Sequence, residues 1–158
     1  MTGEKLPPFI IFQGVPGARN AKTVAEETRF LRGVICTVQA KAWMDSARFL
    51  EWIEKVWRPF CSSGTVSFLL MDAFQVHTTR ACLEAVKQPG AFVDIIPAGY
   101  TSTLQVLDVG VNKPFRNNIT HAFEAHMREG NRRVSRGQIA TWILSAFTEV
   151  STEAVVNS

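Results

Sequence analysis

The amino-acid sequence predicts an α/β fold with parallel strand pairs. Short apolar runs bounded by Pro and Gly alternate with segments in which apolar residues recur every three or four positions. The 158 residues suit one domain, which we expect over residues 1–158, and they can bury a sizeable core. The composition, 46% hydrophobic and 20% charged, excludes a disordered or collagen-like chain.

Neither a membrane nor a secretory route is indicated. No apolar run approaches the roughly 20 residues of a membrane-spanning helix. The N-terminal stretch MTGEKLPPF lacks the apolar segment of a secretory signal. Cys36, Cys61 and Cys82 are widely spaced and odd in number, which favours reduced thiols with packing roles. We therefore expect an intracellular protein with no membrane partner.

The N-terminal part of the chain predicts two strands joined by a loop. Residues 9–12 (FIIF) are apolar and lie between Pro7-Pro8 and Gly14, as in a short buried strand. Residues 17–32 are polar and predict a loop. Residues 33–38 (GVICTV) are rich in β-branched side chains, which favour a second strand.

A helix rich in tryptophan is expected next. Its apolar face repeats at steps of three and four residues and consists of Trp43, Ala47, Leu50, Ile53 and Trp57. Asp45 lies near its start, and Pro59 is expected to follow its end. We interpret this face as part of the core.

Asp72 follows the most apolar run of the chain. Residues 66–71 (VSFLLM) predict a strand that is buried on both faces and therefore central in a sheet. Residues 77–87 predict a helix that stops at Pro89-Gly90, and residues 91–96 (AFVDII) predict a fourth strand.

Two helices are expected near the C-terminal end. A long helix over residues 104–128 is predicted by apolar residues at helical spacing, namely Leu104, Leu107, Val111, Phe115, Ile119 and Phe123. Pro114 should kink or interrupt this helix, because proline lacks the backbone N–H. The last helix is expected to begin at Ser135, which fits a capping box with Gln138.

Two carboxylates, Asp72 and Asp108, are the candidate chemical groups. Asp72 stands at the carboxyl end of the predicted central strand, where α/β folds place ligands. One helix, one strand and a turn fit between the two aspartates, and that path can return Asp108 to the neighbourhood of Asp72. Converging carboxylates hold hard cations such as Mg²⁺, which promote phosphoryl transfer in two-metal sites. Judged by spacing alone, an Asp after a strand is more often a turn former or a helix cap.

Basic residues are concentrated late in the chain. Residues 112–138 carry six basic and two acidic side chains, whereas the whole chain has a net charge of +3. Such a segment is either a phosphate-contacting patch or a solvated helix face, and charge alone favours the solvated face.

Two segments resemble the catalytic blocks of an enzyme superfamily. LLMDAFQVHTT (residues 69–79) resembles the second block of DDE transposases, and IPAGYTSTLQVLDVGVNKPFRNNI (residues 96–119) resembles the third. Both are typical of the pogo/Tigger/jerky group, and flanking segments extend the resemblance over nearly the whole chain. The resemblance implies an RNase H-like fold, with a mixed sheet flanked by helices. It also implies a nuclear DNA endonuclease or transposase that uses two Mg²⁺ or Mn²⁺ ions.

The same resemblance assigns roles to individual residues. Asp72 matches the second catalytic, metal-binding acidic residue, and Asp108 matches the third. His77 matches the histidine five residues after the second acidic residue, and Asn112 lies in the motif that follows the third. DNA is the implied partner, and the candidate nucleic-acid-binding residues are Lys113, Arg116, Arg132 and Arg133.

The first catalytic Asp of the superfamily lies upstream of the segment that begins here at Gly3. We therefore expect an N-terminally truncated domain whose first strands are missing. Two carboxylates supply too little charge to hold two divalent cations close together, so we expect weak metal binding and no strand transfer from this chain alone. Two alternatives stay open: an active strand transferase within a longer chain, and a domesticated protein-interaction scaffold.

Overall fold

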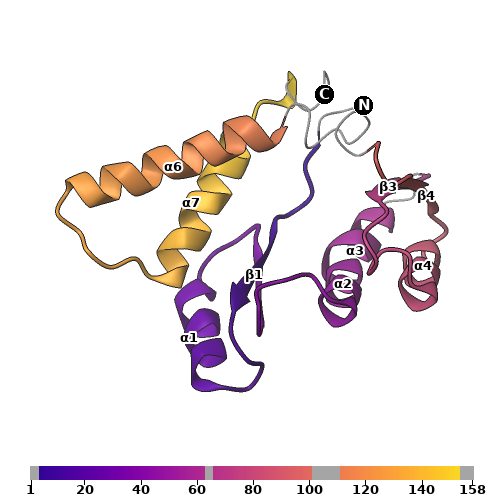
Figure 1. The fold of residues 1–158 in the computed structure, drawn as a ribbon, viewed down its shortest axis with the longest axis horizontal. Helices are drawn as coiled ribbons and strands as arrows, with labels where there is room; N and C mark the ends of the chain where they lie inside the picture. The colour runs from indigo at the N-terminus through magenta and orange to yellow at the C-terminus, as the bar shows by residue number, and fades with distance from the viewer. Residues whose placement is uncertain (1–3, 63–65, 101–110, 154–158) are drawn as a thin grey trace. The chain divides into compact units, whose positions relative to one another are not determined.

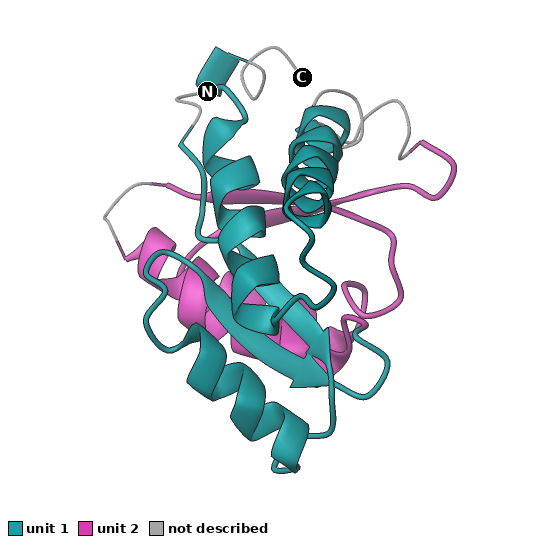
Figure 2. Ribbon diagram, turned by 90° about the vertical axis from the view of Figure 1, so that its left-hand side faces the viewer, with its two compact units in different colours: residues 1–42, 106–158 teal, residues 43–105 magenta. Residues whose placement is uncertain are grey.

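The computed structural model describes residues 4–62, 66–100 and 111–153. The chain divides into two compact units, of which unit 1 comprises residues 1–42 and 106–158 and unit 2 comprises residues 43–105 (Figure 2). Each unit contains a parallel pair of strands together with helices (Figure 1). The predicted α/β class and the parallel pairing are therefore confirmed.

Unit 1 begins with a strand–helix–strand segment. β1 (Phe9–Gln13) pairs in parallel with β2 (Ile35–Gln39), with Phe9 opposite Ile35, and α1 (Arg19–Thr28) connects them. The prediction of a loop over residues 17–32 was therefore wrong. α1 forms because Val24, which is 2% exposed, joins a core that also contains Phe12, Val38 and Ala140. Polar side chains occupy most other positions of α1 and hide this narrow apolar stripe in the sequence.

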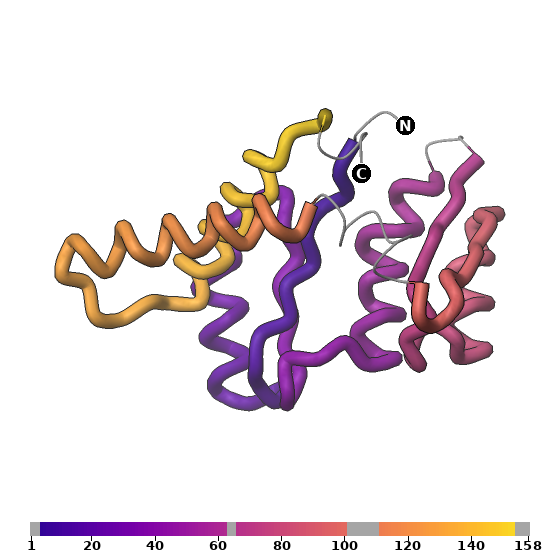
Figure 3. Tube along the Cα trace, turned by 45° about the horizontal axis from the view of Figure 1, so that its top comes forward, coloured from indigo at the N-terminus to yellow at the C-terminus, as the bar shows by residue number. Residues whose placement is uncertain are grey.

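Two helices that pack against each other complete unit 1. α6 (Asn112–Arg128) and α7 (Arg136–Glu149) are joined by residues 129–135 (Figure 3). Phe123 meets Trp142 edge to face, with ring centroids 6.4 Å apart. Pro114 lies in the first turn of α6, where a missing N–H costs little, and α6 continues from there to Arg128. Residues 104–110 of the predicted helix lie outside the described residues, so an interruption before Pro114 stays a prediction.

Both ends of α7 have side-chain caps. The Ser135 hydroxyl oxygen accepts a hydrogen bond from the Gln138 N–H at 3.1 Å, which confirms the predicted N-cap. At the other end, Lys5 Nζ donates to the carbonyl oxygens of Phe147 at 2.6 Å and Val150 at 2.8 Å. A cation there interacts favourably with the helix dipole, so Lys5 ties the N-terminal segment to the end of α7.

Unit 2 begins with one long helical stretch. α2 (Ser46–Trp52), the π-helical segment η1 (Ile53–Trp57) and α3 (Arg58–Cys61) follow one another without a break. Asp45 caps the start, because its Oδ1 accepts the Arg48 N–H at 2.8 Å.

Two predictions for this helix were wrong. Pro59 lies inside α3 instead of after the helix, because the wider π turn before it relaxes the contact between the proline ring and the preceding turn. Trp43 is 65% exposed, since it precedes α2 and does not share the buried face. Trp57 is 2% exposed, as predicted, and its Nε1–H donates to the Val86 carbonyl oxygen at 3.1 Å.

The second strand pair ends at Asp72. β3 (Phe68–Asp72) pairs in parallel with β4 (Phe92–Ile96), and α4 (Arg80–Lys87) connects them. β3 is not buried on both faces as predicted, because Phe68 is 60% exposed and its partner Phe92 is 63% exposed. Met71 lies on the opposite face and is buried. A two-stranded pair with helices packed on one side leaves its other apolar face in solvent.

Among the described residues, no helix has the length and apolar character needed to cross a membrane. All three cysteines are free thiols; Cys61 and Cys82 are buried and Cys36 is partly buried.

Candidate functional site

Asp72 is the last residue of β3, and a tight turn follows it. In the parallel pair, Asp72 lies opposite Ile96 at the carboxyl ends of β3 and β4. The chain turns back at residues 74–77, where the His77 N–H donates to the Phe74 carbonyl oxygen at 2.9 Å. This turn returns the His77 side chain to the end of the strand before α4 begins.

The carboxylate of Asp72 accepts two hydrogen bonds on one oxygen. His77 Nδ1 lies 2.7 Å from Asp72 Oδ1, and the Phe74 N–H donates to the same oxygen at 3.3 Å. Because a carboxylate only accepts hydrogen bonds, this contact requires the His77 proton on Nδ1. The imidazole ring also packs 4.9 Å from the Phe49 ring and 5.5 Å from the Phe74 ring, measured between centroids. Aromatic packing and the turn therefore hold His77 in place.

The second oxygen of Asp72 is available to a ligand. In the described part of the chain, the hydrogen bonds to this carboxylate reach Oδ1, and the side chain is 30% exposed. An oriented, partly exposed carboxylate suits a hard divalent cation, and a supporting hydrogen bond to the ligating group is usual in metal sites. Residues 4–62, 66–100 and 111–153 contain no group of three His, Cys, Asp or Glu side chains able to hold a metal ion. Asp72 therefore fits one ligand of a larger set.

The predicted partner carboxylate, Asp108, lies outside the described residues. Asn112 is the first residue of α6, and its side chain is partly buried. Asp72 belongs to unit 2, whereas Asn112 belongs to unit 1. The approach of Asp108 to Asp72 stays a prediction.

The four predicted DNA-contacting residues lie toward both ends of α6. Lys113 and Arg116 are exposed on its first turns, and Arg132 and Arg133 are exposed in the segment that follows it. About 18 Å of helix separates Arg116 from Arg128 at 1.5 Å per residue. These residues therefore form two basic groups on unit 1 instead of one compact patch. The second group is held to α6, because the Arg133 carbonyl oxygen lies 3.1 Å from His126 Nε2.

Comparison with known protein families decides the ancestry of the chain. All residues from 1 to 158 match the DDE superfamily endonuclease family. The chain belongs to this family. Members of the DDE superfamily endonuclease family generally use divalent metal ions, which agrees with the chemistry that the Asp72 carboxylate suits.

Two relatives place this DDE chain near pogo elements. It is 29% identical over 167 aligned residues to the protein described as "Pogo transposable element with KRAB domain" from Mus musculus, and equally identical to the Homo sapiens protein of that description. Each alignment covers 98% of this chain and 26% of the relative, so the chain spans about a quarter of the relatives' length. No solved structure matches the chain.

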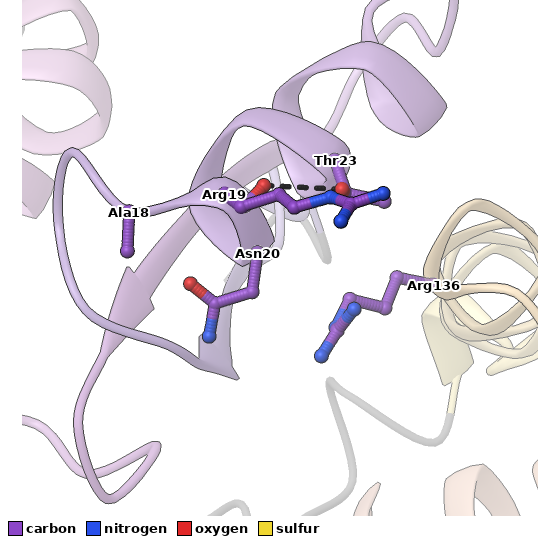
Figure 4. A pocket seen from close by; sticks show the side chains of 5 residues that line it. All are labelled: Ala18, Arg19, Asn20, Thr23 and Arg136. Atoms are coloured by element: carbon purple, nitrogen blue, oxygen red, sulfur yellow. Dashed lines mark hydrogen bonds between the residues drawn. The ribbon is translucent and has the colours of Figure 1, made fainter.

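One basic cavity of this DDE chain has no counterpart among the sequence predictions. Arg19, Asn20 and Arg136 line it, together with Ala18 and Thr23 (Figure 4). This cavity could not be predicted while residues 17–32 were expected to form a loop, because Arg19 and Asn20 line it only as the first residues of α1. The three-residue spacing of Ala21 and Val24 could have predicted the helix, because both side chains lie on its core-facing side.

Unit 1 also contains the Cys36 thiol, which lies in β2. Burial raises its pKa, which keeps the thiol protonated at neutral pH. A protonated, partly buried thiol is a poor nucleophile and a poor metal ligand, so Cys36 serves packing in β2.

Proposed function

We propose that this chain is a transposon-derived, DDE endonuclease-like domain with an RNase H-like arrangement of its strands. The observation that carries the proposal is Asp72, at the carboxyl end of β3 and oriented by His77 at 2.7 Å, in a chain that matches the DDE family throughout. Asp72 takes the role of a metal-binding carboxylate, with Asp108 as its partner. DNA is the proposed partner and the nucleus the proposed location, in line with the transposable-element relatives.

In this proposal, Asp72 Oδ2 and the Asp108 carboxylate bind Mg²⁺ or Mn²⁺. The ion, when bound, supplies Lewis-acid stabilisation of the phosphoryl group that is cleaved. His77 binds Oδ1 of Asp72, which would leave Oδ2 to hold the ion. The turn over residues 74–77 keeps His77 in that position, so the site depends on local geometry as well as on charge.

These 158 residues are proposed to be inactive in strand transfer when tested alone. Two carboxylates contribute a charge of −2, which does not offset two adjacent divalent cations. Without a close pair of ions, most of the stabilisation of the attacking and leaving oxygens is lost. The alternative proposal is an active strand transferase within a longer protein that contributes a third carboxylate.

Metal binding and nicking test this proposal separately. Binding of Mn²⁺ to the full chain is measured by electron paramagnetic resonance, with Asp72→Asn as the test variant and Asp94→Asn as the control. Asp94 is an exposed carboxylate on the neighbouring strand β4, where its Oδ1 accepts the Ile95 N–H at 2.8 Å. We expect the chain to bind Mn²⁺ weakly and Asp72→Asn to reduce the affinity at least about 10-fold, because changes to the residues of a metal site usually lower metal affinity by that much or more. Equal binding by both variants would remove Asp72 from the metal site.

Nicking of supercoiled plasmid in Mg²⁺ or Mn²⁺ tests the inactivity. We expect no difference between the unmodified chain and its Asp72→Asn variant. Metal-dependent nicking that Asp72→Asn abolishes and Asp94→Asn leaves intact would show that the chain is active alone.

A further inference from the structure

A cationic cavity in unit 1 lies between the first turns of α1 and α7. It has a volume of about 480 Å³ and is lined by Ala18, Arg19, Asn20, Thr23 and Arg136. Figure 4 shows Arg136 extending from α7 toward α1, with Asn20 on the other side of the open space. The cavity is distinct from Asp72 in unit 2 and from the basic residues at the two ends of α6.

The two arginines bring positive charge for which the described part of the chain supplies no ion pair. Arg19 and Arg136 are each the first residue of a helix, and neither guanidinium has an ion pair or hydrogen bond among the described residues. The carboxylate of Glu27, which lies on α1, instead accepts the Gly137 N–H at 3.0 Å. First turns of helices favour acidic side chains, so two arginines there oppose the helix dipoles. An anion in the cavity would relieve this charge.

Asn20 supplies an unsatisfied polar atom at the same place. Its Oδ1 is buried and has no hydrogen-bond partner among the described residues. A buried amide oxygen without a donor costs about 1–3 kcal/mol. In Figure 4 this oxygen points toward Ala18 and away from Arg136, so the positive charge that a ligand would meet comes from the two arginines.

We propose that this cavity binds a phosphate group through the guanidinium groups of Arg19 and Arg136. The planar fork of a guanidinium matches two phosphate oxygens, and two arginines match its charge. The Thr23 hydroxyl already donates to the Arg19 carbonyl oxygen at 3.1 Å, so it lines the cavity without competing for the phosphate as a donor. We infer that the phosphate belongs to the DNA backbone, and this part of the inference alone rests on the proposed function.

Inorganic phosphate tests the site without DNA. The full chain labelled with ¹⁵N is titrated with sodium phosphate against sodium chloride at equal ionic strength, and its amide signals are followed by NMR. The test variant is Arg19→Gln/Arg136→Gln, and the control is Arg32→Gln, an exposed arginine after α1. We expect the signals of residues 18–23 and 136 to shift in the unmodified chain and the control, and not in the test variant. An unmodified chain without these shifts, or a test variant that keeps them, would overturn the proposal.

Folding of the test variant is checked by its circular dichroism spectrum and thermal melt. Neither arginine side chain has a polar partner in the described part of the chain, and glutamine is a good helix former, so we expect an unchanged fold. If the double variant fails to fold, Arg136→Lys replaces it: a lysine keeps the charge but lacks the planar fork, so we expect phosphate affinity to fall about 3- to 10-fold. Unchanged affinity in Arg136→Lys would remove Arg136 from the site.

A 20-base-pair duplex identifies the source of the phosphate. Fluorescence anisotropy at low salt should show that the test variant binds DNA about 5- to 10-fold more weakly than Arg32→Gln. The slope of log affinity against log salt should be smaller by about 1 for each phosphate that the test variant no longer binds. If phosphate shifts the cavity signals while both variants bind DNA equally, the site stands and the DNA source is refuted. If no chain binds DNA while the phosphate shifts persist, the proposed DNA partner fails and the site again stands.

Discussion

Replacement of His77 tests whether this residue orients the Asp72 carboxylate. Hydrogen bonds to charged groups contribute about 1.5–3 kcal/mol. The His77 and Asp72 side chains are 20% and 30% exposed, so solvent screening reduces the expected contribution of their 2.7 Å contact to about 1 kcal/mol. The ring contacts with Phe49 and Phe74 add about 0.5–1.5 kcal/mol. We therefore expect His77→Ala to lower the free energy of unfolding by about 2 kcal/mol.

A double-mutant cycle separates the hydrogen bond from the ring packing. His77→Phe keeps an aromatic ring and removes the Nδ1 donor, and Asp72→Ala removes the acceptor. Urea unfolding of each variant is followed by the fluorescence of Trp52 and Trp57, which lie in the same unit as the pair. We expect a coupling free energy of about 1 kcal/mol. A coupling within about 0.3–0.5 kcal/mol of zero would refute the orienting role, because independent sites show values of that size.

Three further predictions concern packing and the thiol. Gly137→Ala would place a Cβ 2.7 Å from the Glu27 carbonyl oxygen. Overpacking costs about 1–3 kcal/mol and outweighs the gain in helix propensity, so the Tm should fall by about 2–4 °C. An unchanged or higher Tm would mean that α1 and α7 move apart to accommodate the added methyl group. Trp57→Phe leaves the buried Val86 carbonyl oxygen without its donor and should cost about 2–3 kcal/mol in urea unfolding, and a reduction below about 0.5 kcal/mol would contradict that bond. Burial raises the pKa of Cys36, so the folded state should lose stability as the pH rises through the range in which the thiol ionises. At about pH 8, iodoacetamide should modify Cys36 more slowly than it modifies a free cysteine, and equal rates would contradict the burial of the thiol.

Local patterns identified most of the elements. Apolar runs located all four described strands to within a few residues, and the Ser135 capping signal located the start of α7. These signals succeed because strand burial and helix capping depend on neighbouring residues. α1 was missed because a helix with a narrow apolar stripe and many charges resembles a loop when it is judged by polarity. The helix was predicted to end before Pro59 because no pattern in the sequence indicates the π turn that accommodates this proline.

The exposure of β3 could not be predicted from its composition. An apolar run predicts burial on both faces only if other elements supply two covering layers. Phe68 and Phe92 lie on the face of the β3–β4 pair that stays exposed in the described structure. Composition therefore indicated how apolar the strand is, and the number of packed layers decided how much of it is buried.

The amino-acid sequence by itself determined the family, the α/β class and the identity of the candidate carboxylates, because these follow from residue types in a fixed order. Tertiary structure alone decided that His77 bonds one oxygen of Asp72, since a turn of the backbone sets that contact. It also decided that Arg19 and Arg136, far apart in the chain, line one cavity. The two arginines are close because α1 packs against α7. Buried apolar residues such as Val24 and Ala140 stabilise that packing, and the arginines do not.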